Sequence, residues 1–226
     1  VLRDLCDYET VISESYTPDC LKRRNEYMVD SSALVIAVYS GAAGGTRNTM
    51  LYLTKLKNDI PPYHTPDVIR QSEAELAQVL RNDLAGIISA YGVMTVCGVP
   101  RSKRESSYPF SQMGLKRTIR AVAHELGMED GMDYIIRNTD TVCTHRARSG
   151  HGGAGEMPRP GLLKDTCFMS PRIAGKNILL VDDIYTPGVG IDEDAIQAVL
   201  DCGANSVIFY AVGHTAKGAN YYRYCA

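Results

Sequence analysis

The chain lacks the features that would direct it into a membrane or make it a general binder of nucleic acid. No run of apolar residues among the 226 approaches the ~18 needed to span a bilayer, and no signal peptide is visible. The net charge is only −2, so no bulk positive charge is present to hold a phosphate backbone. We therefore expect neither a membrane partner nor a nucleic-acid partner.

The chain also lacks closely spaced cysteine pairs. Its seven cysteines contain no Cys-x-x-Cys motif, and several fall in predicted strands or helices, where a free thiol packs as a small apolar group. A reducing cytoplasm is the simplest setting for such a pattern. The sequence starts at Val1, and we expect further native sequence before it. Whether the chain forms a homodimer is left open.

The sequence itself indicates a globular α/β protein. Its hydrophobic content of 45% and charged content of 22% are typical of globular domains, and 226 residues suit one large or two small domains. The segment Pro61–Pro66 contains three prolines and breaks the elements around it. It divides the chain into a predicted domain at 1–60 and another at 65–226.

Apolar periodicity in the second domain predicts alternating strands and helices. Strands are expected at 94–99, 134–136, 178–181 and 206–212, and helices at 67–90, 112–126 and 192–202. The residues from 138 to 171 show no periodicity and predict one long loop, of which 146–161 should be mobile without ligand. This alternation predicts a parallel sheet flanked by helices.

The most informative motif follows the strand predicted at 178–181. Asp182 and Asp183 come at its carboxyl end, where open α/β sheets bind ligands. Gly188 and Gly190 let the next turn bring its N–H groups to a phosphate at the start of a helix. Two carboxylates beside an anion-binding loop suit a ribose phosphate. An ordinary strand, turn and helix is the alternative interpretation.

Residues 178–190 resemble the signature of type I phosphoribosyltransferases, and Val99–Lys103 resembles the pyrophosphate loop of that family. The resemblance covers about 67–215 and implies displacement of pyrophosphate from 5-phosphoribosyl 1-diphosphate (PRPP) by a base or amine, with Mg²⁺ as cofactor. It implies a catalytic, Mg²⁺-associated pair, a 5-phosphate loop and a pyrophosphate loop. The catalytic, Mg²⁺-associated pair is Asp182 and Asp183. The 5-phosphate loop contains Thr186, Gly188, Val189 and Gly190. The pyrophosphate loop contains Pro100, Arg101, Ser102 and Lys103. The 138–171 segment stands where the family carries a flexible catalytic loop.

The chain departs from the family pattern in its phosphate loop. Pro187 removes an amide donor and Gly190 removes a hydroxyl, while three acids at 192–194 are expected to repel a phosphate at that helix start. These departures favour a second interpretation, a PRPP- or nucleotide-sensing protein without turnover. The alternative interpretation of the basic residues at 103–104 is that they form a solvated turn and bind no pyrophosphate.

The first domain contains another strand followed by a glycine-rich loop. Residues 33–39 predict a buried strand, and Gly44, Gly45, Thr46 and Arg47 follow it as a candidate phosphate loop. About 4–59 resembles the C-terminal half of the SLOG superfamily of Rossmann-like nucleotide-binding proteins, in particular its YpsA-like branch. Residues 50–53 are apolar or aromatic where related hydrolases have glutamates, so the resemblance implies nucleotide binding, with a nucleotide hydrolase as the weaker alternative.

Overall fold

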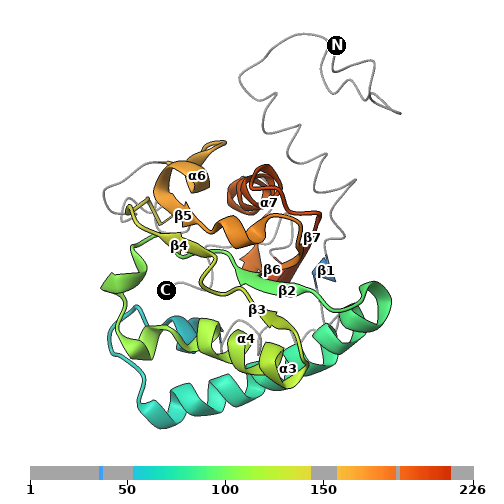
Figure 1. Cartoon of the computed structure of the whole chain (residues 1–226). Coiled ribbons are helices and arrows are strands. Elements are labelled where there is room, and N and C mark those ends of the chain that lie inside the picture. The colour runs from blue at the N-terminus through green and yellow to red at the C-terminus, as the bar shows by residue number, and fades with distance from the viewer. Residues whose placement is uncertain (1–35, 38–52, 144–156, 187–188, 215–226) are drawn as a thin grey trace, which may run out of the picture.

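The computed structural model describes residues 36–37, 53–143, 157–186 and 189–214. They form a parallel five-stranded sheet with strand order β1-β7-β6-β2-β3, with helices against both faces (Figure 1). The predicted α/β fold is confirmed at this level. Among the described helices, none combines the length and apolar character that crossing a membrane requires.

The sheet contains β1 (Ile36–Ala37), β2 (Thr95–Gly98), β3 (Glu129–Asp130), β6 (Asn177–Tyr185) and β7 (Ser206–His214). The main helices are α3 (Pro66–Tyr91), α4 (Gly114–Glu125), α6 (Leu162–Thr166) and α7 (Ile191–Asp201), and residues 53–57 are also helical. A separate antiparallel pair joins β4 (Ile135–Arg137) to β5 (Cys167–Met169). Short 3₁₀ turns span Glu105–Ser107, Phe110–Gln112 and Pro171–Ile173.

Local sequence explains the long helix α3. The Thr65 hydroxyl caps its start by accepting from the Val68 N–H, and Pro66 fits the first turn, where no backbone donor is needed. Its buried face includes Leu76, Leu80 and Leu84, which recur every four residues. The helix ends at Gly92, whose φ of 82° suits glycine.

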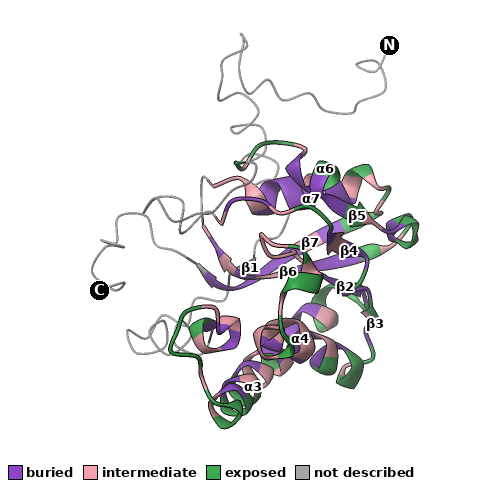
Figure 2. Cartoon of the chain, turned by 90° about the vertical axis from the view of Figure 1, so that its left-hand side faces the viewer, coloured by how far each residue is buried: buried purple, intermediate pink, exposed green. Residues whose placement is uncertain are grey.

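Two apolar cores cover the two faces of the sheet. One lies under α3 and α4 and includes Val96, Leu179, Val181 and Tyr210. The other lies under α6 and α7 and includes Cys97, Ile178, Leu180, Phe209 and Ala211. Neighbouring strand residues enter opposite cores because side chains alternate along a strand. The sheet is therefore buried on both sides, whereas the outer surface of α3 is exposed (Figure 2).

Three details differ from the sequence-based expectations. The strand predicted at 134–136 lies in the small β4–β5 pair and not in the parallel sheet. The long loop predicted at 138–171 is wrong at its end, because α6 and β5 occupy 162–169. The third difference is the edge strand β3, which was not predicted. The elements α6, β5 and β3 are all too short for their apolar residues to show a periodic pattern. Most of the segment expected to be mobile, 146–161, lies outside the described residues.

The described residues before Pro61 join the same sheet and core as those after it. Ile36 pairs in parallel with Tyr210, and Leu53 and Leu56 are buried in the core under α3. The division into domains at 1–60 and 65–226 stays a prediction, because most of the first segment lies outside the described part of the chain.

A carboxylate joins three strands at their amino ends. Glu129 accepts hydrogen bonds from the Thr95 hydroxyl at 2.9 Å, the Tyr134 hydroxyl at 2.9 Å and the Lys176 ammonium at 2.7 Å. Thr95 begins β2, Glu129 begins β3 and Lys176 precedes β6. The bond from Lys176, reinforced by the two hydroxyls, lowers the pKa of Glu129 to about 2.

We expect Glu129→Gln to destabilise the protein at pH 7 and to have little effect near pH 2. Because the pKa of Glu129 falls from 4.5 to about 2 on folding, its stabilisation is complete above pH 4.5 and is lost as the pH drops through about 2. Urea unfolding of both proteins across this range measures the difference. Glu125→Gln, at the exposed Arg81–Glu125 pair, is the matched control and should have the smaller effect. A constant difference at all pH values would contradict this account.

Candidate functional site

The order of the strands places a topological switch point between β2 and β6. From β2 the chain continues to β3 on one side of it, and later returns to β6 on the other side. Open α/β sheets bind ligands at such a switch point, outside the carboxyl ends of the strands. Gly98 pairs with Val181, and the Val99 N–H donates to the Val181 carbonyl at 2.9 Å. The predicted pyrophosphate loop and acid pair therefore begin at adjacent positions.

The two acids of the pair face different partners. β6 runs beyond the predicted end at 181, so Asp182 and Asp183 lie within it and their side chains diverge. Asp183 forms an ion pair with Lys57, from the helical residues 53–57 on the α3 side of the sheet. Asp182 is in hydrogen-bonding contact with Asp192 of α7, on the other side. Lys57 could not be predicted as a site residue, because only the tertiary fold brings it to Asp183.

This edge of the sheet holds buried charge. Burial, together with the Asp183 carboxylate, raises the pKa of Asp182 to about 7. Burial and the neighbouring Asp182 raise the pKa of Asp192 well above its ordinary value. Burial alone would lower the pKa of Lys57, but the Asp183 carboxylate reverses this and the pKa is raised. The Oδ1 atom of Asp192 is buried and has no hydrogen-bond partner among the residues that the structure describes.

The predicted phosphate loop leads into α7. Thr186 and Val189 follow β6, and Gly190 precedes the helix with a φ of 84° that favours glycine. Gly188 lies outside the described residues, as does Pro187. The loop thus reaches a helix amino end, where backbone N–H groups favour an anion.

The three acids at the start of α7 are turned into the protein. Asp192, Glu193 and Asp194 are 6%, 3% and 4% exposed. Asp194 accepts from the backbone N–H of Leu163 at 2.8 Å, and Glu193 accepts from the Tyr185 hydroxyl at 3.1 Å. Because Asp194 and Glu193 accept hydrogen bonds from the protein, these two carboxylates are not free to repel a phosphate as three exposed acids would.

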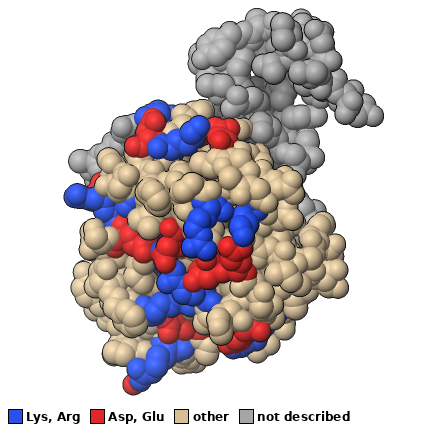
Figure 3. Space-filling view, viewed as in Figure 1, with Lys and Arg blue, Asp and Glu red and all other residues tan. Residues whose placement is uncertain are grey.

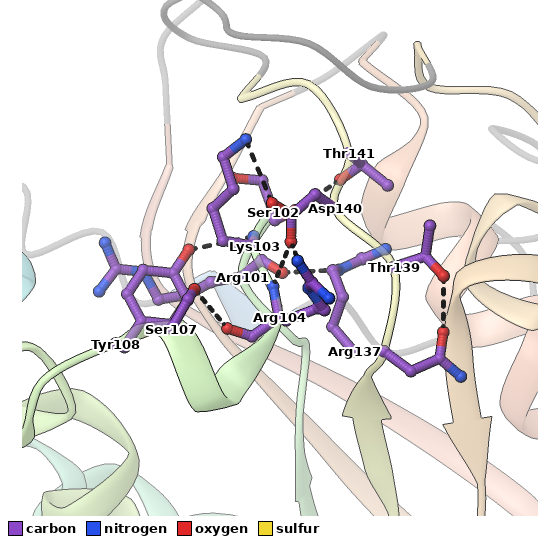
Figure 4. A network of polar contacts seen from close by, with 11 residues as sticks. Arg101, Ser102, Lys103, Arg104, Ser107, Tyr108, Arg137, Thr139, Asp140 and Thr141 are labelled. Atoms are coloured by element: carbon purple, nitrogen blue, oxygen red, sulfur yellow. Dashed lines mark hydrogen bonds and ion pairs between the residues drawn. The ribbon is translucent and has the colours of Figure 1, made fainter.

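The basic side chains of the predicted pyrophosphate loop have acidic partners. Arg101 contacts Asp59 at 3.1 Å and stacks on the Tyr108 ring with its guanidinium carbon 4.2 Å from the centroid. The Lys103 ammonium lies 3.7 Å from a carboxylate oxygen of Asp140, and Figure 4 shows the two side chains facing each other. More widely, Figure 3 shows basic and acidic side chains interleaved over one face of the molecule.

A second segment holds the predicted pyrophosphate loop in place through hydrogen bonds. The Thr141 N–H donates to the Ser102 carbonyl at 2.7 Å, the Arg104 N–H donates to Asp140 at 2.8 Å, and Arg137 donates to the Arg101 carbonyl at 2.6 Å (Figure 4). We define residues 137–141 as the strap. No local pattern predicts the strap, which begins just after the strand predicted at 134–136.

The structure does not describe the predicted nucleotide loop of the first domain. Gly44, Gly45, Thr46 and Arg47 lie outside the described residues. Nucleotide binding there stays a prediction.

We expect Asp182→Asn to raise the stability of the protein above pH 7. Because folding raises the pKa of Asp182 from 3.8 to about 7, the wild type loses stability as the pH rises through this interval. Asparagine removes the ionisation and keeps an oxygen that can accept from the Asp183 N–H. The melting temperature at pH 8 should rise by roughly 2–4 °C for each kcal/mol of relieved repulsion, and the gain should shrink towards pH 4. Asp165→Asn, on the surface, controls for the loss of one negative charge; a variant less stable than the wild type at pH 8 would contradict the prediction.

Comparison with known proteins gives little further information. No protein-family model matches the chain. An uncharacterized SPbeta prophage-derived protein, YoqJ, from Bacillus subtilis (strain 168) is 45% identical to it over 40 residues. This match spans 18% of the present chain and 23% of YoqJ, and it shows no family.

Proposed function

We propose that the protein is a phosphoribosyltransferase that transfers ribose 5-phosphate from PRPP to a nitrogen acceptor, a base or an amine. One observation carries the proposal: the β2–β6 pairing brings a loop with basic side chains and a pair of carboxylates to adjacent positions at one end of the sheet. The resemblance to type I phosphoribosyltransferases predicts the same two groups at the two ends of one substrate. The coarse α/β fold is compatible with this function.

The reaction would break the bond between C1 of the ribose and the diphosphate oxygen, which leaves with the electron pair. The acceptor nitrogen would form the new bond to C1 and lose a proton. Positive charge develops on the ribose in the transition state, so the Asp182 and Asp183 carboxylates would stabilise it. Arg101 and Lys103 would stabilise the negative charge on the leaving diphosphate. The amino end of α7 would hold the 5-phosphate.

The acid pair suits the Mg²⁺ ion that the proposed function requires. Asp182 and Asp183 supply carboxylate oxygens, which are the hard ligands that Mg²⁺ prefers. No group of three or more potential ligands occurs among the described residues, so a bound ion would take further ligands from substrate or water. When bound, Mg²⁺ would neutralise charge on the diphosphate.

A binding protein without turnover is the second candidate. Asp59 and Asp140 pair with Arg101 and Lys103, so the cations of the loop are already neutralised before a ligand arrives. Such a resting state suits a PRPP or nucleotide sensor, in which a ligand exchanges places with internal carboxylates. Pro187 also removes one donor from the phosphate loop.

If the protein is an enzyme, Asp182→Asn should slow pyrophosphate release by at least about tenfold, which corresponds to about 1.4 kcal/mol in the barrier. The variant loses the charge that faces the developing cation, although we expect it to be the more stable protein at pH 8. The measurement is pyrophosphate release from PRPP and Mg²⁺ with a panel of nucleobases and simple amines. Unchanged turnover in the variant would refute the role of this acid.

Lys103→Ala separates the two candidate functions. In an enzyme it should lower kcat/KM for PRPP more than it lowers PRPP affinity, because Lys103 acts on the leaving group. In a sensor it should lower affinity alone. Lys164→Ala is the matched control, since Lys164 also pairs with a single aspartate, Asp201, but lies on α6. Tight PRPP binding by the wild type, without release across the whole panel, would refute the transferase.

A further inference from the structure

Arg137 is a buried cation without an acidic partner. It ends β4 and is 4% exposed. Its Nε donates to the Arg101 carbonyl at 2.6 Å and its Nη1 to the Thr166 hydroxyl at 2.5 Å, while Nη2 donates to none of the described residues. No carboxylate of the described chain forms an ion pair with it.

The charge of Arg137 is costly to bury. A guanidinium stays ionised in proteins, so it cannot escape desolvation by losing its proton. Burial lowers the pKa of Arg137, and the opposing influence of Cys167, Tyr108, Asp194 and Asp140, in decreasing order, offsets this only in part. Asp140 is paired with Lys103 and Arg104 instead. A neutral side chain could bridge two oxygen atoms without this cost, so the charge itself calls for an explanation.

The contact with Arg101 orients the next peptide group. In a trans peptide the carbonyl and the following N–H point in opposite directions, and the one cis peptide among the described residues is Pro61–Pro62. With the Arg101 carbonyl held against Arg137, the Ser102 N–H must point away from Arg137. That N–H makes no hydrogen bond within the described part of the chain, whereas Lys103 and Arg104 donate theirs to Tyr108 and Asp140.

We propose that Arg137 is a positioning residue for anion binding: it turns the Arg101 carbonyl inward, leaves the Ser102 N–H as a donor without a partner in the described part of the chain, and adds buried positive charge behind it. This inference rests on the proposed function, which places a diphosphate at Pro100–Lys103. A carbonyl facing that ligand would repel it. Arg137 removes this repulsion and replaces it with attraction.

The test compares stability with anion affinity in Arg137→Met. The variant keeps the length of the side chain and removes the unpaired charge, so its melting temperature should equal or exceed that of the wild type. Its affinity for inorganic pyrophosphate, measured by calorimetry without Mg²⁺, should fall by about tenfold or more. Arg137→Lys keeps the charge and should retain most of the affinity. Arg172→Met is the matched control, because Arg172 is 68% exposed and lies near Glu129 at the amino ends of the strands.

Each outcome decides between the structural and the positioning role. Lower affinity with undiminished stability in Arg137→Met, and recovery in Arg137→Lys, supports the inference. A destabilised Arg137→Met, or one that binds pyrophosphate as the wild type does, overturns it. A wild type that binds neither pyrophosphate nor PRPP overturns the proposed function, and this inference with it. A wild type that binds both, with affinity unchanged in Arg137→Met, overturns the inference alone.

Discussion

The parallel pairing of β6 with its two neighbours is the constraint on which the rest of the structure depends. β6 lies between β2 and β7 and contributes buried side chains to both apolar cores. Its register with β2 fixes where the loop at Pro100–Lys103 begins relative to Asp182 and Asp183. A shift by one residue would exchange the faces of the two acids and separate each from its present partner. The geometry of the candidate site is thus a consequence of how the core packs.

Much of this sheet could be predicted from the sequence because its signals are local. The apolar run at 178–181 indicated a strand buried on both faces, and Thr65, Pro66 and Gly92 mark the ends of α3. The divergence of Asp182 and Asp183 was not predicted, since the strand was expected to stop at 181. Alternation along a longer strand would have indicated it.

The features of the site that could not be predicted from the sequence depend on contacts between distant segments of the chain. Lys57 meets Asp183 across more than one hundred residues, and Arg137 meets the Arg101 carbonyl only because the β4–β5 pair lies beside the loop. Nothing in the residues around Arg137 distinguishes it from a surface arginine at the end of a strand. The buried acids of α7 show the same limit: their sequence suits an ordinary helix start, and only the fold shows which donors they face.

The two ends of the strands differ in what they contribute. At the amino ends of the strands, Glu129 accepts hydrogen bonds from three segments of the chain. At the carboxyl ends lie the buried acids Asp182 and Asp192, and Arg137, which has no acidic partner in the described part of the chain. The strands are thus held together at their amino ends by contacts that take no part in ligand binding. Substitutions at the carboxyl ends of the strands can then accumulate over evolutionary time without destabilising the fold. A lineage of such proteins could change what it recognises while keeping the same framework.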